Sequence, residues 1–419
     1  MTTLHVVLPA GVDDPAGPSG GNRYDRRACD ELAAQGWRVV EHAADGDWPR
    51  PDAAQVARLA ATLAAVPDGG LILLDGLVAC AAPDVVVPAA ARLRLAVLVH
   101  LPLVDEAGDG DLDARERETL RAAGAVIATS EGAARRLAAL HGLDGVRVAA
   151  PGVDPAPRSA GTANGSRLLC VAAVIPRKAQ DVLVSALASV AELDWTCDFA
   201  GALDRDPPYA ARVAAAADEL GGRVNFAGPL VGAELDARYA EADLLVLPSR
   251  AETYGMVVTE ALARGVPVLA TDVSGVPEAL GWAPAPPDQA DPPDSATPSG
   301  RLADDASQPR PADPSSWSLT RPGGAGASQA GTGAVAGGGA GAAARQGVDT
   351  PGEPAGSGWV RPGMLVPPGD SAALADALRR WLTQPEVRVK LRAAAAARRS
   401  TLDGWDATAR ALAAVLDAL

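Results

Sequence analysis

Lysine is almost absent from this sequence: of its 37 basic residues, only Lys178 and Lys390 are lysines. Alanine, glycine, proline and arginine are abundant instead, which indicates a coding bias and makes any one of those residues weak support for a function. A lysine is more informative in such a chain. Aromatic residues make up only 3% of the sequence, so its cores are expected to be mostly aliphatic.

Other absences exclude whole classes of protein. The four cysteines are far apart and form no CxxC pair, so neither a zinc site nor a disulfide framework is expected. The longest apolar run, 95–104, contains His100 and Pro102 and is too short to span a bilayer. The first five residues lack the charged start of a signal peptide. A net charge of −15 argues against nucleic acid or a polybasic membrane contact. A cytoplasmic protein is the expectation, and the sequence gives no support for membrane association.

Short apolar runs alternate with amphipathic segments along most of the chain. This alternation predicts parallel sheets covered by helices on both faces. The expected strands are 4–9, 37–40, 71–74, 96–99, 125–128, 168–172, 195–199, 223–227, 244–247, 266–270 and 364–366. The expected helices are 23–34, 53–66, 85–93, 112–123, 131–140, 179–190, 208–220, 232–241, 256–264, 371–383, 386–399 and 403–419.

A break near Pro151-Gly152 and the polar stretch 159–166 divide this pattern into two consecutive doubly wound α/β domains. We assign residues 1–155 to the first domain, 165–385 to the second and 386–419 to C-terminal helices, the last packing back on the first domain. One segment, 283–358, does not fit: 51 of its 76 residues are Ala, Gly, Pro or Ser, too few large apolar groups to offset ordering entropy. It is expected to be a disordered insertion in the second domain.

Several catalytic motifs are missing. The chain has no P-loop, no GxSxG elbow and no HExxH, and its four histidines are not at metal-ligand spacing. DxD triplets at 45–47, 109–111, 111–113 and 204–206 lie in loop-like contexts, and a chain with 52 acidic residues forms several by chance. No metal and no cofactor are therefore expected, although a metal-dependent transferase that uses a DxD stays a lesser alternative.

The strongest local signal runs from Leu244 to Val268, where an apolar strand enters a loop and then a helix. Doubly wound folds bind phosphates at such a place. The amides of Gly255, Met256 and Val257 would face a diphosphate. Glu260 would accept hydrogen bonds from a ribose diol, and Glu252 would meet a sugar hydroxyl. The alternative is that Glu252 caps the helix and Glu260 is a surface charge.

The spacing Glu252-x7-Glu260 and its neighbours resemble the signature of glycosyltransferase family 4, whose members are retaining, metal-independent enzymes of the GT-B fold, with two Rossmann-like domains facing a cleft. Further segments resemble the family in the same order over nearly the whole chain apart from 283–358. They are Pro18-Ser-Gly-Gly21, Val97-Leu-Val-His100, Thr129-Ser-Glu-Gly132, Pro151-Gly-Val-Asp154, 174–183, 224–228, Gly275-Val-Pro-Glu278 and 363–370.

The resemblance implies a role for each matching residue. Lys178, assisted by Arg177, would neutralise the diphosphate leaving group, and His100 would lie near the transferred sugar. Gly20 and Gly21 would let the backbone approach the reacting centre. The remaining donor-binding residues would be Gly228, Glu252, Thr253, Tyr254, Gly255, Met256, Val257 and Glu260. The substrates would be a nucleotide-sugar donor and a glycan, lipid-linked or small-molecule acceptor.

The sequence also departs from the family pattern. The Gly-Arg pair that usually precedes the lysine loop is Ala172-Ala173 here, and the glycine that commonly follows the lysine is Ala179. A retaining hexosyltransferase is the main interpretation. A nucleotide-sugar epimerase or hydrolase of the same fold and a non-catalytic nucleotide-sugar-binding protein are the alternatives. Arg23, Arg26 and Arg27 are expected to form a solvent-facing or acceptor-facing stripe.

Overall fold

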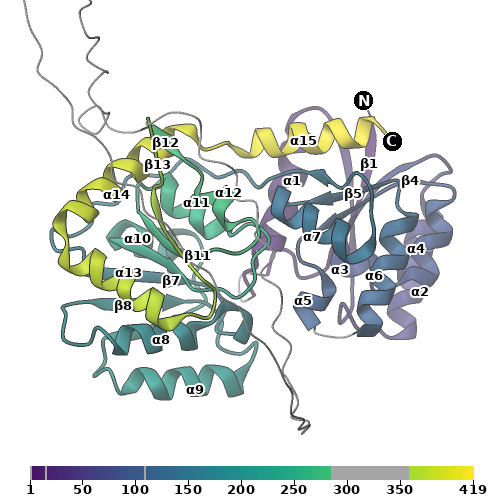
Figure 1. Ribbon diagram of the computed structural model, residues 1–419. Helices are drawn as coiled ribbons and strands as arrows, with labels where there is room; N and C mark the ends of the chain where they lie inside the picture. Colours follow the sequence, from purple (N-terminus) through teal and green to yellow (C-terminus); the bar gives the residue numbers. More distant parts are fainter. Residues whose placement is uncertain (1, 15–16, 108–109, 285–357) are drawn as a thin grey trace, which may run out of the picture. The chain divides into compact units, whose positions relative to one another are not determined.

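The computed structural model describes residues 2–14, 17–107, 110–284 and 358–419. Within these residues, two six-stranded parallel sheets follow one another along the chain (Figure 1). We call the parts built on them the first and the second lobe. The predicted disordered insertion, 283–358, lies almost wholly outside the described residues.

The first lobe has the strand order β2-β1-β3-β4-β5-β6. Its strands are β1 (Thr3–Pro9), β2 (Arg38–Ala44), β3 (Leu71–Asp75), β4 (Arg94–Val99), β5 (Ala125–Ala128) and β6 (Arg147–Val148). Its helices are α1 (Gly20–Ala34), α2 (Ala53–Ala65), α3 (Gly76–Ala79), α4 (Pro83–Ala90), α5 (Leu103–Ala107), α6 (Gly110–Ala122) and α7 (Glu131–His141).

Both faces of the first sheet are covered. Along β3, Ile72 and Leu74 enter one apolar cluster with α2, α4, α6 and α7. Leu71 and Leu73 enter another cluster, with α1 and the last helix of the chain, α15 (Trp405–Asp417). The ring of Trp405 contacts the ring of Tyr24 edge to face, with centroids 5.7 Å apart. The continuous apolar run of β3 is therefore the pattern of a strand buried on both sides.

The second lobe has the strand order β14-β11-β10-β7-β8-β9. Its strands are β7 (Arg167–Val171), β8 (Thr196–Ala200), β9 (Val224–Gly228), β10 (Leu244–Leu247), β11 (Val268–Thr271) and β14 (Gly363–Val366). Its helical segments are the 3₁₀ turn η1 (Pro176–Lys178), α8 (Gln180–Ala188), α9 (Pro207–Asp218), α10 (Gly232–Glu241), α11 (Met256–Ala263), α12 (Val276–Leu280), α13 (Ser371–Thr383), α14 (Pro385–Arg398) and the 3₁₀ turn η3 (Arg399–Thr401).

A short antiparallel ladder joins β12 (Ala283–Pro284) to β13 (Trp359–Val360). These strands flank residues 285–357, so the described residues on either side of that segment lie next to each other. The first two residues assigned to the insertion are therefore part of a strand, which moves the start of the low-complexity segment past Pro284.

In each sheet the order of strands reverses at one point, where the chain crosses from one side of its first strand to the other, and this switch point positions the site. In the first sheet, β1 is followed by β2 on one side and by β3 on the other. In the second sheet, β7 leads to β8 on one side and β10 lies on its other side. Ligands of open parallel sheets bind beyond the carboxyl ends of strands at such switch points. The loops that follow β1 and β3, and those that follow β7 and β10, are therefore the places to examine.

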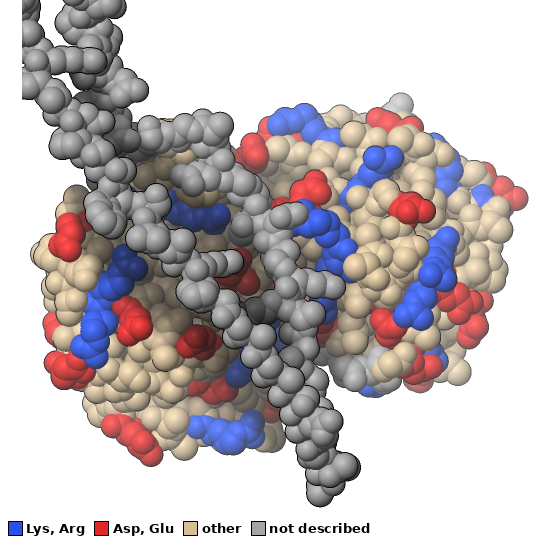
Figure 2. Space-filling view, viewed as in Figure 1, with Lys and Arg blue, Asp and Glu red and all other residues tan. Residues whose placement is uncertain are grey.

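None of the helices among the described residues combines the length and the apolar character needed to cross a bilayer. On the face drawn in Figure 2, acidic and basic side chains are interspersed over both lobes.

Candidate functional site

Lys178 and Glu252 meet at the switch point of the second lobe. Lys178 ends the turn η1 after β7, and Glu252 lies in the loop after β10. The Lys178 Nζ atom is 2.5 Å from Oε1 of Glu252, which also accepts a hydrogen bond of 2.8 Å from the Ser249 hydroxyl. The two charged side chains are 18% and 8% exposed, so the ion pair is largely shielded from water.

The electrostatics of this pair favour the charged carboxylate. Burial alone would raise the pKa of Glu252, but the nearby charges of Lys178 and Arg177 outweigh it and hold that pKa below its ordinary value. Glu252 therefore does not cap the helix α11, whose first turn is preceded by Gly255 with no side-chain cap. Arg177 donates from its guanidinium to the Ala251 carbonyl oxygen at 3.4 Å, which places it beside the same loop.

The loop then passes close to the first lobe. The Thr253 hydroxyl donates a 2.6 Å hydrogen bond to the backbone oxygen of His100, and the Ser130 hydroxyl donates to the backbone oxygen of Thr253 at 2.5 Å. Tyr254 follows, and burial raises its pKa to about 12, so its phenol stays neutral. These contacts fix the loop between two strand ends of the first lobe and the start of α11.

Gly255 takes the left-handed conformation, with φ 86°, which favours a residue without a side chain. The backbone N–H groups of Met256 and Val257 open α11 and lack carbonyl partners within the helix. Their assignment to a diphosphate stays a prediction. The region also includes Gly20, because a Cβ placed there would lie 3.7 Å from the Met256 sulfur atom.

Glu260, one turn into α11, is only 6% exposed, so it is not a surface charge. Its Oε1 atom accepts a 2.6 Å hydrogen bond from the Arg23 guanidinium, and its Oε2 atom accepts a 2.9 Å hydrogen bond from the Tyr239 hydroxyl. The carboxylate that the resemblance assigns to a ribose diol is thus already occupied by two donors of this chain.

The arginines of α1, expected as a solvent-facing or acceptor-facing stripe, are half-buried, and each of them is ion-paired. Arg23 contacts Asp154 as well as Glu260, Arg27 also contacts Asp154, and Arg26 pairs with two other carboxylates. Asp154 belongs to the Pro151-Gly-Val-Asp154 motif and therefore links two helical turns of α1 to the segment between the lobes.

The glycine loop is also shorter than expected, since α1 begins at Gly20 and not at Arg23. Ser19 is its N-cap residue and accepts a hydrogen bond from the Asn22 amide at 3.4 Å. Gly20 and Gly21 form the first turn. A Cβ at Gly21 would lie 3.3 Å from the His100 ring, so glycine lets α1 approach that ring closely.

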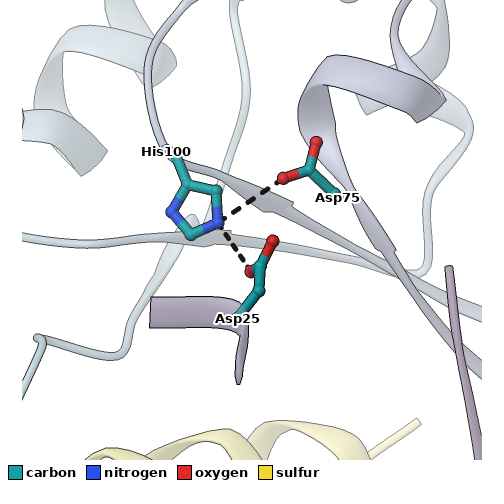
Figure 3. A group of neighbouring side chains, drawn as sticks. All are labelled: Asp25, Asp75 and His100. Carbon is teal, nitrogen blue, oxygen red and sulfur yellow. Dashed lines mark hydrogen bonds and ion pairs between the residues drawn. The ribbon is translucent and has the colours of Figure 1, made fainter. Parts of the chain in front are cut away.

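His100 follows β4 and belongs to a cluster at the switch point of the first lobe. Its Nε2 atom lies 2.7 Å from Oδ1 of Asp25, on α1, and 3.5 Å from Oδ2 of Asp75, which ends β3 (Figure 3). The two carboxyl groups are 2% and 5% exposed. The ring of Tyr24 contacts the imidazole edge to face at 5.1 Å.

Gly228 is the predicted site residue that no described contact joins to this group. It closes β9 with φ 73°, and its carbonyl oxygen accepts a hydrogen bond from the Gly201 amide at 2.8 Å. No atom lies within 4 Å of the position of a Cβ there. Its assignment to the donor stays a prediction.

Three aspartates of the DxD triplets have local structural partners. Asp206 caps α9 by accepting from the Tyr209 amide at 3.0 Å. Asp111 and Asp113 pair with arginines four residues further along α6. Asp113 also lies near Glu116 and the buried His141, a combination whose atoms could together hold a metal ion. This group lies in α6 and α7, among residues that the resemblance does not assign to the donor.

Sequence reasoning missed Asp25 and Asp75, although both left a signal. Asp25 stands three residues before Ala28 and seven before Leu32, so it falls on the buried stripe that α1 turns inward. Asp75 directly follows a continuous apolar strand, at the carboxyl end where polar residues of this fold class meet ligands. Tyr239 left no comparable signal.

Known proteins share this architecture. Sucrose-phosphate synthase from Thermosynechococcus elongatus superposes with a TM-score of 0.68 at 19% identity, and the match covers 100% of this chain and 99% of that one. Anabaena HepE, solved with UDP and glucose, gives 0.66 at 16% identity, with 100% of each chain covered. The chain therefore has the GT-B fold, two Rossmann-like parallel-sheet lobes, as the sequence predicted.

Residues 165–292, which include Lys178, Glu252 and Glu260, match the family model described as glycosyl transferases group 1. The D-inositol 3-phosphate glycosyltransferase of Mycobacterium leprae is 33% identical over 220 residues, 45% of this chain and 51% of that protein. The Nocardia farcinica enzyme of the same name is 34% identical over 197 residues, 39% of this chain and 41% of that protein. The chain thus spans about half the length, or less, of these curated relatives.

Proposed function

We propose that this protein is a group 1, family 4 glycosyltransferase that moves a hexosyl group from a nucleotide-diphosphate sugar to an acceptor hydroxyl, with retention of configuration and without a metal ion. The observation that carries the proposal is the meeting of Lys178 and Glu252 at the switch point of the second lobe. The match of residues 165–292 to the group 1 model supports it.

Each residue would act on a different part of the donor. Glu260 would hold the ribose diol, and Glu252 would hold a hydroxyl of the sugar. The amides of Met256 and Val257 would hold a phosphate at the start of α11. As the bond between the anomeric carbon and the diphosphate oxygen breaks, that oxygen takes the electron pair. Lys178 stabilises the charge that develops there.

The acceptor hydroxyl then forms the new bond to the anomeric carbon on the same face and passes its proton to the departing phosphate. No carboxylate nucleophile is needed in this scheme. The Lys178 Nζ atom is already 2.5 Å from Oε1 of Glu252, so the ammonium group would be shared between Glu252 and the phosphate. Arg177 beside the loop would take part of the role of the family arginine that Ala173 replaces.

The proposal extends to partners and location. The acceptor is a glycan, a lipid-linked sugar or a small molecule bound mainly by the first lobe, with no nucleic acid, no cofactor and a cytoplasmic setting. We keep 1–155 and 165–385 as the proposed domain limits. The names of the curated relatives make D-inositol 3-phosphate the first acceptor to try. UDP and glucose, present in the HepE structure, make UDP-glucose the first donor.

A donor screen followed by product analysis tests the proposal. Thermal-shift measurements against UDP-, GDP- and ADP-sugars identify the donor, because a ligand of the native state raises the melting temperature. That donor, labelled in its sugar, is then incubated with acceptors in the presence of excess EDTA. We expect a labelled adduct with the donor's anomeric configuration. Release of free sugar or an epimer without an adduct would refute the transferase assignment, and activity restored only by Mn²⁺ would refute metal independence.

Matched variants locate the reaction. Lys178→Met and Glu252→Gln should each lower turnover by about 10²-fold, the usual effect of losing a group that stabilises developing charge or positions the donor. Lys390→Met and Glu386→Gln are the controls, since both residues are exposed on α14 and should leave turnover unchanged. Unchanged turnover in the first two variants would refute the site.

A further inference from the structure

Two buried carboxyl groups hold the His100 side chain, and no step of the proposed transfer uses them. Asp25 approaches the ring from α1, and Asp75 approaches it from the end of β3. Both contact the same ring nitrogen, Nε2, at 2.7 and 3.5 Å (Figure 3). Burying charged groups is costly unless they are paired, and apolar side chains would fill this space at lower cost. Three titratable groups buried together at a switch point therefore indicate a role other than packing.

The ring has a defined orientation. In Figure 3 the second ring nitrogen, Nδ1, lies on the side of the imidazole away from both carboxyl groups. The His100 side chain is 18% exposed, whereas Asp25 and Asp75 are 2% and 5% exposed. One nitrogen is therefore anchored in the first lobe. The backbone oxygen of the same residue is held by Thr253, in the loop that carries Glu252.

The other groups facing the ring do not compete for its protons. Tyr24 packs edge to face against it and donates its own hydroxyl to the Ala149 carbonyl oxygen at 2.9 Å. Burial raises the pKa of Tyr24 well above its usual range, so this phenol stays neutral. Gly21 brings no side chain, and Thr253 reaches only the backbone. Asp25 and Asp75 are thus the charged groups that decide the state of the imidazole.

One oxygen of the cluster lacks a partner. Oδ2 of Asp25 is buried and accepts no hydrogen bond in the structure. Buried carboxylate oxygens normally have a donor. If both carboxyl groups were ionised beside a charged ring, the cluster would carry one net negative charge in a nearly water-free place. One proton held between the two carboxyl groups supplies the missing donor and makes the cluster neutral.

We propose that Asp25 and Asp75 are positioning residues for His100: they share one proton, keep the imidazole charged with Nε2–H on Asp25, and leave Nδ1–H as a hydrogen-bond donor to a hydroxyl of the transferred sugar. The sugar in this statement rests on the proposed function, but the state of the ring does not.

The electrostatic balance of the cluster agrees with this assignment. Burial alone would lower the pKa of His100, yet the charge and the hydrogen bond of Asp25 raise it to about 9. Burial and the charge of Asp25 raise the pKa of Asp75 to about 7. At neutral pH the ring is then charged, and Asp75 holds its proton in about half of the molecules.

The test reads the ring directly. Long-range ¹H–¹⁵N spectra report the protonation of each histidine, and the His100→Gln variant identifies the His100 signals. In the full-length protein we expect His100 to remain charged at pH 8. In Asp25→Asn it should be neutral at pH 8, because the main charge that holds the proton is gone. In Asp75→Asn it should match the parent protein at pH 6 and lose its proton about one unit earlier on the alkaline side.

A matched control comes from the chain's other buried histidine–carboxylate pair. Nε2 of His141 lies 3.0 Å from Glu116, so Glu116→Gln should change the His141 signals and leave those of His100 in place. A His100 that titrates near 6.5 in the parent protein would overturn the proposal. So would a His100 that stays charged at pH 8 in both aspartate variants.

Turnover separates this inference from the proposed function. With the donor and acceptor found above, Asp25→Asn should lower kcat at least about tenfold while changing the donor KM little, because an uncharged His100 ring no longer donates Nδ1–H to the sugar in the transition state. Asp75→Asn should match the parent kcat at pH 6 and fall below it at pH 8. Ring titrations as expected in a protein that forms no adduct would overturn the transferase function alone.

Discussion

Replacing Glu252 by glutamine removes the carboxylate that faces Lys178 and leaves the ammonium group without its closest counter-charge. The side chain keeps its shape, and its remaining oxygen can still accept the hydrogen bond from Ser249. What is lost is the charge of a pair whose atoms are 2.5 Å apart, in which Glu252 is 8% and Lys178 is 18% exposed.

The size of the loss follows from that burial. Breaking a fully buried ion pair from one side costs roughly 3–5 kcal/mol, because an unpaired charge stays behind. Lys178 is partly exposed and water can solvate part of its charge, so we expect Glu252→Gln to lower the free energy of unfolding by about 2–3 kcal/mol. The double variant with Lys178→Met leaves no charge unpaired and should lose about 1 kcal/mol.

Urea unfolding followed by tryptophan fluorescence measures these differences at pH 7, with both single variants and the double variant in one cycle. The pair should also depend on pH. Because the pKa of Glu252 is held below its ordinary value of 4.5, its contribution is present above that pH and is lost as the pH falls below it. A coupling energy under about 0.5 kcal/mol at pH 7 would refute the reasoning.

Three other outcomes are expected. Ala179→Gly should hardly change the urea midpoint. Ala179 has the left-handed conformation (φ 55°), and relief of its strain gains about 1–2 kcal/mol. The lost methyl group and the greater entropy of the unfolded chain cost a similar amount. Ala186→Gly, equally buried inside α8, should cost about 2 kcal/mol. The stability advantage of the parent protein over His100→Gln should be full below pH 6.5 and disappear as the pH rises through about 9, as chemical denaturation at several pH values would show. Trp405→Ala should lower the free energy of unfolding of the first lobe by about 3 kcal/mol in calorimetry, because it empties a site beside Tyr24. An unchanged melting profile would contradict this role for α15.

The fold was predictable from the sequence because its signal is local. Runs such as Leu71–Leu74 and Leu244–Leu247 are apolar at every position, which only a strand covered on both faces requires. The short helices α3, α5 and α12 were missed as elements, since four or five residues are too few to show a helical period. The extension of β2 to Ala44 was missed because Glu41 and His42 are polar and interrupt the apolar run, as an edge strand allows.

The positions of Lys178 and Glu252 after their strands were predictable for the same reason, and their assignment to a donor stays a prediction. Lys178 and Glu252 each lie one loop beyond a recognisable strand, so strand ends and residue types suffice to place them near a ligand. The first-lobe cluster needed more. The three residues Asp25, Asp75 and His100 come from three separate elements, and their contact depends on the order of strands in the sheet. No local sequence pattern determines the order of strands in a sheet. For this reason His100 was recognised from the sequence, whereas its partners Asp25 and Asp75 were not.

The ion pair of Arg23 with Glu260 could not be predicted from any local sequence pattern. The two residues are 237 positions apart and belong to different lobes. The sequence pattern that assigns an acidic residue to the ribose diol does not indicate which side chains of this chain already donate hydrogen bonds to that residue. Here both carboxylate oxygens of Glu260 accept hydrogen bonds, one of them charge-assisted and 2.6 Å long. Under the proposed function, a ribose diol would have to replace or join Arg23 and Tyr239 at Glu260, so the affinity for the nucleotide sugar would depend on the difference between two sets of hydrogen bonds. A nucleotide sugar bound there would then also change the contact that Arg23 and Glu260 make between α1 and α11.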